Sequence, residues 1–228
     1  MTAAAENSGL DSVRHANSME TKPANDIASV VADLVSRALA VSGQPPGSEW
    51  LDVATALGNL PGVDEVDRLR FRHREHKIHV GRWQHLEVTT RALVQVAPLS
   101  LSIAPEVVTS FSAGRDHGVL ILRYAACSGE RLARVSDTLQ PLHEDAVAAL
   151  RRDMQTLISH GLVHPYVRGT VHWLVSSERG ILVLDDWYAL ARCTAEEGRE
   201  ALGEIDRAAQ RHAARVAART GAAPTGDG

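Results

Sequence analysis

Hydrophobic residues near the start of the chain recur every three or four positions, which is the spacing of an amphipathic helix. Two such runs cover residues 27–42 and 49–57. A side chain of a type that caps helices, Asp26 or Ser48, stands before each run, and a glycine follows each run. The pattern predicts two helices that together form an N-terminal extension.

The period then shortens to two, which is typical of a β-strand. Between Leu69 and Val80, apolar residues alternate with arginine, lysine and histidine, and Glu75 falls between the two halves of the pattern. This alternation predicts a strand hairpin. Helical spacing returns from His85 and is halted by Pro98, because proline cannot continue a helix.

The middle of the chain predicts two further strands and a well-patterned helix. Residues 105–124 contain two apolar runs joined by a turn rich in glycine and aspartate. The second run, Val119–Tyr124, is mostly apolar, which favours a central place in a sheet. Helical spacing over residues 143–160 ends at Gly161. The apolar stripe of this helix consists of Val147, Leu150, Met154, Leu157 and Ile158.

Two short strands and a polar helix complete the predicted order. Residues 171–176 and 181–185 are apolar, and Ser177–Gly180 supplies a turn between them. The helix expected over residues 194–220 has acidic residues early and arginines late, an arrangement that the helix dipole favours. The sequence of elements therefore predicts an α+β fold.

The amino-acid composition indicates which residues form the core and which segments lie outside it. The chain has 228 residues, of which 44% are hydrophobic and 4% aromatic, so leucine, valine and alanine must fill most of the core. Residues 1–26 and 220–228 are polar and rich in residues that break helices. We expect these segments to be disordered tails around an ordered body of residues 27–219.

Charge and cysteine content argue against several classes of function. The formal net charge of −4 and the pI of about 6.2 do not favour a nucleic-acid partner. The N-terminus lacks the apolar core of a signal peptide, and no window approaches about 18 unbroken apolar residues. We therefore expect a cytoplasmic protein without a membrane partner. Cys127 and Cys193 are expected to be reduced thiols.

The order of elements over residues 66–190 resembles the protein-kinase-like fold, including its aminoglycoside-phosphotransferase branch. Two motifs support the resemblance: "LRRDMQTLISHGLVHP" is similar to the central helix leading into the catalytic loop, and "GILVLDDWYAL" to the strand that delivers a metal-binding aspartate. The resemblance implies a reduced two-lobe fold. Its parts would be a helical extension (27–62), an N-lobe-like strand region (63–126) and a truncated C-lobe-like helical region (127–219).

The residues that should carry catalysis in this family are mostly replaced. His164 matches the histidine that opens the catalytic loop, but Tyr166 stands where the catalytic aspartate is expected. A phenol, with an unperturbed pKa near ~10, does not replace a carboxylate as a base at neutral pH. Asp186 matches the metal-binding aspartate, although Asp185 takes that place if the strand is one residue shorter.

The features that would bind a nucleotide are sparse. The resemblance assigns the phosphate-binding lysine to Lys77 and its glutamate partner to Glu87. Gly58 and Gly62 are too few to build a phosphate-binding loop, and Pro61 removes a backbone donor. The segment that follows Asp186 is also shorter than the resemblance leads us to expect.

Three histidines have a spacing that suggests a metal site. In a single strand, His73 and His79 would share one face while His76 would point away. Zinc needs three or four convergent ligands, and no cysteine or acidic cluster completes a set here. We therefore interpret these histidines as solvated strand residues.

Together these residues favour a non-catalytic function, that of a cytosolic bacterial pseudokinase-type module, regulatory or scaffolding, that binds an unidentified partner protein. No cofactor is expected, and any binding of ATP with Mg²⁺ through Lys77, Glu87 and Asp186 should be weak. Two alternatives stay open. One is an atypical small phosphotransferase using ATP and Mg²⁺. The other is a winged-helix DNA-binding regulator, because a helix followed by a two-stranded wing also fits residues 150–184.

Overall fold

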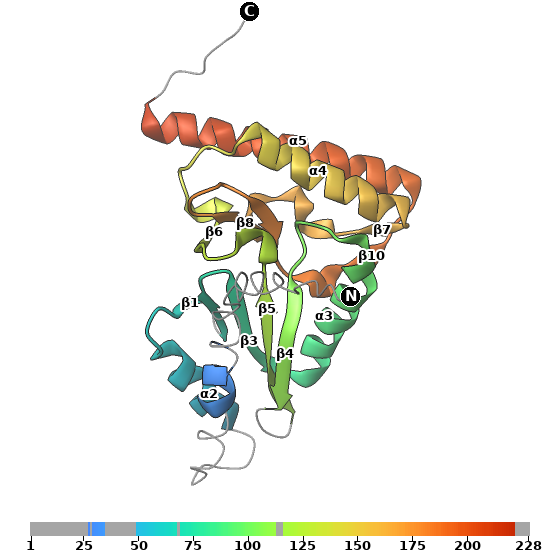
Figure 1. Ribbon diagram of the computed structural model, residues 1–228. Helices are drawn as coiled ribbons and strands as arrows, with labels where there is room; N and C mark the ends of the chain where they lie inside the picture. Colours follow the sequence, from blue (N-terminus) through green and yellow to red (C-terminus); the bar gives the residue numbers. More distant parts are fainter. Residues whose placement is uncertain (1–26, 28, 35–48, 68, 113–115, 222–228) are drawn as a thin grey trace, which may run out of the picture.

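The computed structural model describes residues 27, 29–34, 49–67, 69–112 and 116–221. This part of the chain has an α+β fold with antiparallel sheets (Figure 1). The predicted α+β class is therefore confirmed. Within the described ranges, no helix is both long and apolar enough to cross a membrane. The two predicted caps, Asp26 and Ser48, and nearly all of the predicted tails lie outside the described residues.

The larger sheet has five strands in the order β1-β2-β3-β5-β4. Strand β5 lies between β3 and β4, so the mostly apolar segment is central, as its sequence predicts. The predicted hairpin is formed by β2 and β3. The five strands are β1 (Asp64–Asp67), β2 (Arg70–His73), β3 (His76–Arg82), β4 (Glu106–Ser112) and β5 (His117–Arg123).

The two faces of this sheet contribute to different parts of the core. Val119 and Ile121 of β5 pack in one cluster with Val53 and Leu57 of α2 (Glu49–Gly58). Leu120 and Leu122 belong to a second cluster, which includes α3 (Trp83–Val96). Helices α2 and α3 therefore cover opposite faces, and alternation along β5 supplies apolar side chains to both. Residues 27 and 29–34 are helical, and Ile27, Val31 and Leu34 join the cluster on the α2 side.

The second half of the molecule contains a smaller sheet and several single turns. Its three strands have the order β6-β8-β9, and the predicted turn at Ser177–Gly180 connects β8 to β9. The strands are β6 (Leu132–Arg134), β8 (Trp173–Ser176) and β9 (Leu182–Leu184), with a separate pair formed by β7 (Leu162–Val163) and β10 (Ala191–Arg192). The 3₁₀ turns are η1 (Ala97–Leu99), η2 (Ala125–Cys127), η3 (Val135–Asp137), η4 (Pro165–Arg168), η5 (Thr170–His172) and η6 (Trp187–Ala189).

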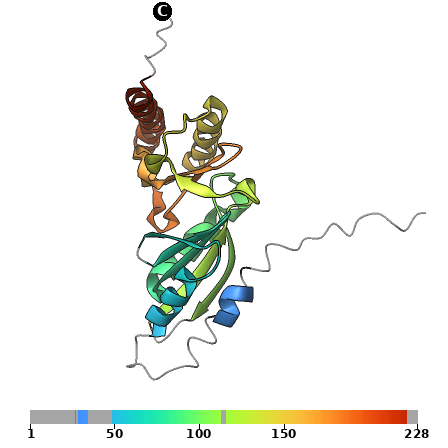
Figure 2. The ribbon, with the colours of Figure 1, turned by 90° about the vertical axis from the view of Figure 1, so that its left-hand side faces the viewer.

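Two helices, α4 (Glu144–Ser159) and α5 (Ala195–Thr220), lie side by side at the end of the molecule away from α2 (Figures 1 and 2). Helix α5 starts with a capping box, in which Thr194 and Glu197 each bind the other's backbone N–H. The two helices approach closely at Gly198, where a Cβ atom would lie 2.6 Å from the Ile158 side chain. Glycine at this position therefore permits the contact.

Helix α4 is the central element of this half. Leu150, Met154 and Leu157 each have 0% exposed surface, as their helical spacing predicts. They belong to the same core cluster as Leu120 and Leu122 of the large sheet. The apolar core is therefore continuous from the sheet to α4.

Truncating Leu157 tests the role of this core. We expect Leu157→Ala to reduce the free energy of unfolding by about 2–5 kcal/mol, because it removes buried contacts and leaves a cavity. Arg152→Ala, an exposed change on the same helix, should stay within about 0.5 kcal/mol. Urea denaturation measures both values. Equal, small effects of the two changes would show that α4 is not a core helix.

Candidate functional site: a buried charge network

Two neighbouring aspartates at the end of β9 meet basic side chains from the β2–β3 hairpin. Asp185 and Asp186 are 2% and 5% exposed, and Lys77 on β3 is 2% exposed. The Lys77 ammonium forms an ion pair with Asp185, and its Nζ lies 3.5 Å from Oδ1 of Asp186. The structure thus brings together Lys77 and Asp186, two residues that the sequence singled out separately.

Two arginines of β2 extend this network. Nη1 of Arg70 lies 3.1 Å from Oδ1 of Asp186, and Nη2 of Arg72 lies 3.9 Å from Oδ2 of Asp185. On the other side, Nδ1 of His172 lies 3.0 Å from Oδ2 of Asp186. The two carboxylates are therefore surrounded by cations and hydrogen-bonding groups from β2, β3 and η5.

The backbone after β9 turns sharply and places both carboxylates. Asp186 has a φ of 58°, in the left-handed region that aspartate tolerates better than most residues. Its backbone N–H donates to Oδ1 of Asp185 (2.9 Å), and the indole N–H of Trp187 donates to the carbonyl of Leu184 (2.9 Å). These contacts fix the turn, so the aspartates point into the network and not into solvent.

Burial and charge pull the pKa values of this group in opposite directions. Burial lowers the pKa of Lys77, although Asp185 and Asp186 partly restore it. Burial alone would raise the pKa of Asp185, but the Lys77 ammonium beside it holds that pKa well below its usual range. We therefore assign the charged forms to both Lys77 and Asp185 at neutral pH, because each offsets the desolvation of the other.

An aromatic cluster lies next to the network, around the position expected to hold a catalytic base. The Tyr166 hydroxyl lies 3.0 Å from the Tyr188 hydroxyl, and the Tyr166 ring stacks on His172 with centroids 4.0 Å apart. His164 is fully buried and lies edge-on to Trp187, with centroids 5.0 Å apart. Tyr166 is therefore held by Tyr188 and His172, and His164 packs against Trp187, beside the charge network.

The network leaves little space for a ligand. The hollow bounded by its basic residues, Phe71 and Asp185 is too small to enclose a nucleotide. Its lining consists of Arg70, Phe71, Arg72, Lys77, Arg134 and Asp185. Side chains of the protein itself therefore occupy this junction.

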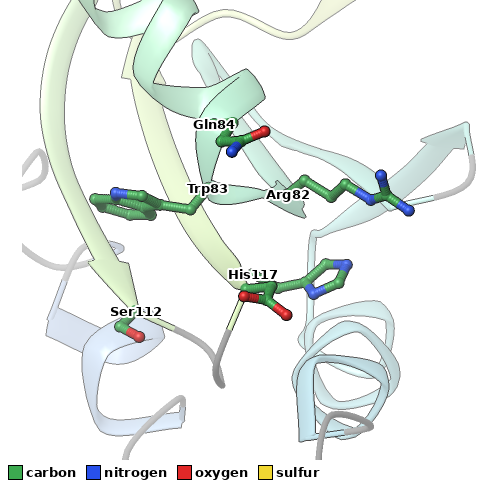
Figure 3. A pocket seen from close by; sticks show the side chains of 6 residues that line it. Arg82, Trp83, Gln84, Ser112 and His117 are labelled. Carbon is green, nitrogen blue, oxygen red and sulfur yellow. The ribbon is translucent and has the colours of Figure 1, made fainter.

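A second hollow, of about 790 Å³, lies at the other end of β3. Figure 3 shows Arg82 and Trp83 extending to opposite sides of it, with His117 below. Gly118 allows Trp83 to lie against β5, because a Cβ atom there would stand 2.4 Å from the indole ring. We assign no ligand to this hollow.

The pairing expected between Lys77 and Glu87 is not seen. Glu87 is exposed on α3, and its ion pair is with Arg91, at 3.6 Å and one helical turn away. Lys77 pairs instead with the two aspartates. The resemblance assigned Glu87 as the partner of Lys77. In the structure, Glu87 lies near the start of α3 and its side chain is exposed to solvent.

The interpretation of the three histidines as solvated residues is wrong for two of them. His76 and His79 are 2% and 5% exposed. A turn separates His73 from His76, so these residues face each other across the hairpin and do not lie along one strand. His79 lies on the same face of β3 as Lys77, which the end of β9 covers, whereas His76 points to the opposite face of the strand. In the described part of the chain, no group of three residues could hold a metal ion.

Sequence reasoning missed the basic residues of β2. Arg70 lies opposite His79 and Arg72 lies opposite Lys77 in the hairpin register, so all four share one face. The alternation of Arg70 and Arg72 with Phe71 contained this information. What it did not contain was the position of the aspartates, which lie more than a hundred residues further along the chain.

Comparison with models of known protein families finds no match, and neither does comparison with curated proteins. The site must therefore be interpreted from its own geometry.

Removing the ammonium of Lys77 tests whether the network stabilises the fold. We expect Lys77→Met to reduce the free energy of unfolding by about 3–5 kcal/mol, because it leaves buried carboxylates with fewer partners. Asp185→Asn should also destabilise. The double variant should be more stable than the sum of the single effects predicts, with a coupling of about 1 kcal/mol or more.

Chemical denaturation of the four proteins measures this coupling. The exposed pair Glu87–Arg91 provides a matched control, since Arg91→Met should change stability by less than about 1 kcal/mol. Additive effects of Lys77→Met and Asp185→Asn would contradict the ion pair.

His164 should make stability depend on pH. Burial, opposed in part by Asp186, lowers the pKa of His164 from 6.5 to about 4. The unfolded chain therefore binds a proton that the folded chain does not, so this contribution to stability is complete above pH 6.5 and is lost as the pH falls toward 4. We expect His164→Gln to reduce the slope of unfolding free energy against pH by up to about 1.4 kcal/mol per pH unit in this window. Urea titrations at several pH values measure the slope, and an unchanged slope would contradict the assignment.

Proposed function

We propose that this protein is a non-catalytic kinase-like (pseudokinase) module that acts by binding a partner protein. The proposal starts from the order of elements on which the resemblance to the protein-kinase-like fold rests. A five-stranded antiparallel sheet with α3 between β3 and β4 is followed by α4, a loop containing His164 and a strand ending at Asp185 and Asp186.

The observation that carries the proposal is the charge network. In a kinase-like enzyme, the residues matching Lys77 and Asp186 would contact phosphate and metal. Here they neutralise each other, and Arg70 adds a further cation on Asp186. A metal–nucleotide complex would have to displace these contacts and open a space that the side chains fill.

The environment of Tyr166 supports the same proposal. Phosphoryl transfer to a hydroxyl uses a carboxylate that accepts or orients the proton. Tyr166 offers a phenol that is hydrogen-bonded to Tyr188 and stacked on His172. Neither the chemistry nor the packing of Tyr166 suits it to act as a base at neutral pH.

Exposed apolar residues on α3 support a protein partner. Trp83, Val88 and Val94 are 41%, 42% and 64% exposed. Aromatic residues are enriched at protein interfaces, and Trp83 is the largest of these three side chains. This helix also packs against η6, directly after the two aspartates. A partner on α3 would therefore sit close to the charge network.

The two alternatives make different demands on the structure. An atypical phosphotransferase using ATP and Mg²⁺ would need the network to open before nucleotide binds. A winged-helix DNA-binding regulator would need a recognition helix whose surface is free to enter the major groove. The apolar stripe of α4 is buried, and Arg151 of α4 pairs with Asp206 of α5.

Nucleotide binding and turnover test the proposal. We expect no ATP turnover with Mg²⁺ or Mn²⁺, and a Kd for ATP–Mg²⁺ of about 0.1 mM or weaker. At that limit, about 1 mM ATP would stabilise the fold by about 1.4 kcal/mol, and the melting temperature would rise by no more than about 3–5 °C.

A coupled ATPase assay and a thermal-shift titration measure both quantities. Turnover that disappears in Asp186→Asn would overturn the proposal and favour the phosphotransferase alternative. So would a shift above about 10 °C, since it would require tight binding.

A further inference from the structure

A small basic hollow lies on α5 beside the η5 turn and shares no lining residue with the charge network. It is formed by α5 and the η5 turn and has a volume of about 150 Å³. Ala208, Arg211, His212 and Arg215 lie on one face of the helix because they are spaced by three or four residues. Thr170 of η5 closes the opposite side. The lining residues are Thr170, Ala208, Arg211, His212 and Arg215.

Backbone contacts hold both guanidinium groups in place. Arg215 donates to the carbonyls of Ser136 (2.7 Å) and Val135 (2.8 Å), at the η3 turn. Its Nη2 also lies 2.9 Å from Nδ1 of His212. The imidazole is anchored in turn, because its Nε2 lies 2.9 Å from the carbonyl of Gln140. Arg211 donates to the carbonyl of Arg168 (2.9 Å). The hollow is therefore pre-organised, which lowers the entropic cost of binding.

Positive charge exceeds negative charge at this site. Arg215 contacts carbonyl oxygens and His212, and among the described residues it has no carboxylate partner. Glu204 lies 3.6 Å from Nη2 of Arg211, but it is shared with Arg207, at 2.9 Å. Like charges four residues apart on a helix are unfavourable by themselves. An anion between the two guanidinium groups would offset that repulsion.

We propose that this hollow binds a phosphate group. The planar guanidinium group of Arg211 suits the oxygens of phosphate, and Arg215, whose Nη atoms donate to carbonyls, adds positive charge to the hollow. Sites that enclose a whole ligand of nucleotide size have volumes of about 300–1,000 Å³, so a hollow half that size or less accepts free phosphate or the phosphate end of a small phosphomonoester. This site is separate from the charge network and does not depend on the proposed pseudokinase function.

Titration with inorganic phosphate at constant ionic strength tests the proposal. Isothermal calorimetry on the full chain should show saturable binding with a Kd of about 1 mM or tighter. Arg211→Gln should weaken binding at least tenfold, which corresponds to about 1.4 kcal/mol. Arg211→Lys should weaken it less, because it keeps the charge but loses the planar fork.

Arg207→Gln is the matched control. Arg207 and Arg211 are 52% and 58% exposed and share Glu204, but only Arg211 lines the hollow. We expect Arg207→Gln to change the Kd for phosphate by less than about twofold. Without phosphate, Arg207→Gln and Arg211→Gln should have the melting temperature of the unsubstituted protein. A parallel titration with glycerol phosphate distinguishes a site for phosphomonoesters from a site for free phosphate. Saturable binding of either ligand supports the proposed site.

Two results would overturn the proposal. One is the absence of saturable binding of both ligands up to about 20 mM, well beyond the expected Kd. The other is an equal loss of affinity in Arg207→Gln and Arg211→Gln, which would show a diffuse charge effect of α5 and not a defined site.

Discussion

Asp185 and Asp186 place two carboxylates at the end of β9 in a position that solvent hardly reaches. An ionised carboxylate loses several kcal/mol of hydration when it is buried, so it must find cations or hydrogen-bond donors in the protein. The β2–β3 hairpin provides Arg70, Arg72 and Lys77. The hairpin and the end of β9 are more than a hundred residues apart in sequence. Pairing these charges therefore fixes where the second half of the molecule sits on the sheet.

Backbone hydrogen bonds and the apolar core support the same arrangement. The Tyr124 hydroxyl donates to the carbonyl of Leu184 (2.9 Å), and the backbone N–H of Leu184 donates to the carbonyl of Ile103 (3.0 Å). Leu184 and Trp187 belong to the core cluster that contains Leu120 and Leu122. Charge pairing is directional, whereas apolar burial is not. The core thus supplies most of the stability, and the network selects the orientation.

Local patterns in the sequence predicted the elements better than they predicted the site. The stripe of Leu150, Met154 and Leu157 and the central position of β5 follow from spacing alone, because helix and strand periods are local properties. The burial of His76 and His79 could not be predicted in this way, since it depends on which part of the chain covers the hairpin. The partners of Lys77 could not be predicted from local patterns either. The family resemblance pointed to Glu87 one helix away, whereas the structure uses Asp185, which is distant in sequence.

The charge balance of the network determines which ligands would compete with its internal ion pairs. Three cations, Arg70, Arg72 and Lys77, face the two carboxylates, Asp185 and Asp186. A divalent metal ion would add positive charge where cations are already in excess, and Mg²⁺ gives up its bound water reluctantly. A nucleotide phosphate would be attracted by the same cations, but the filled hollow gives it no room. In this protein the charges pair with one another, so their interactions offset the desolvation of the buried carboxylates and contribute to the stability of the fold.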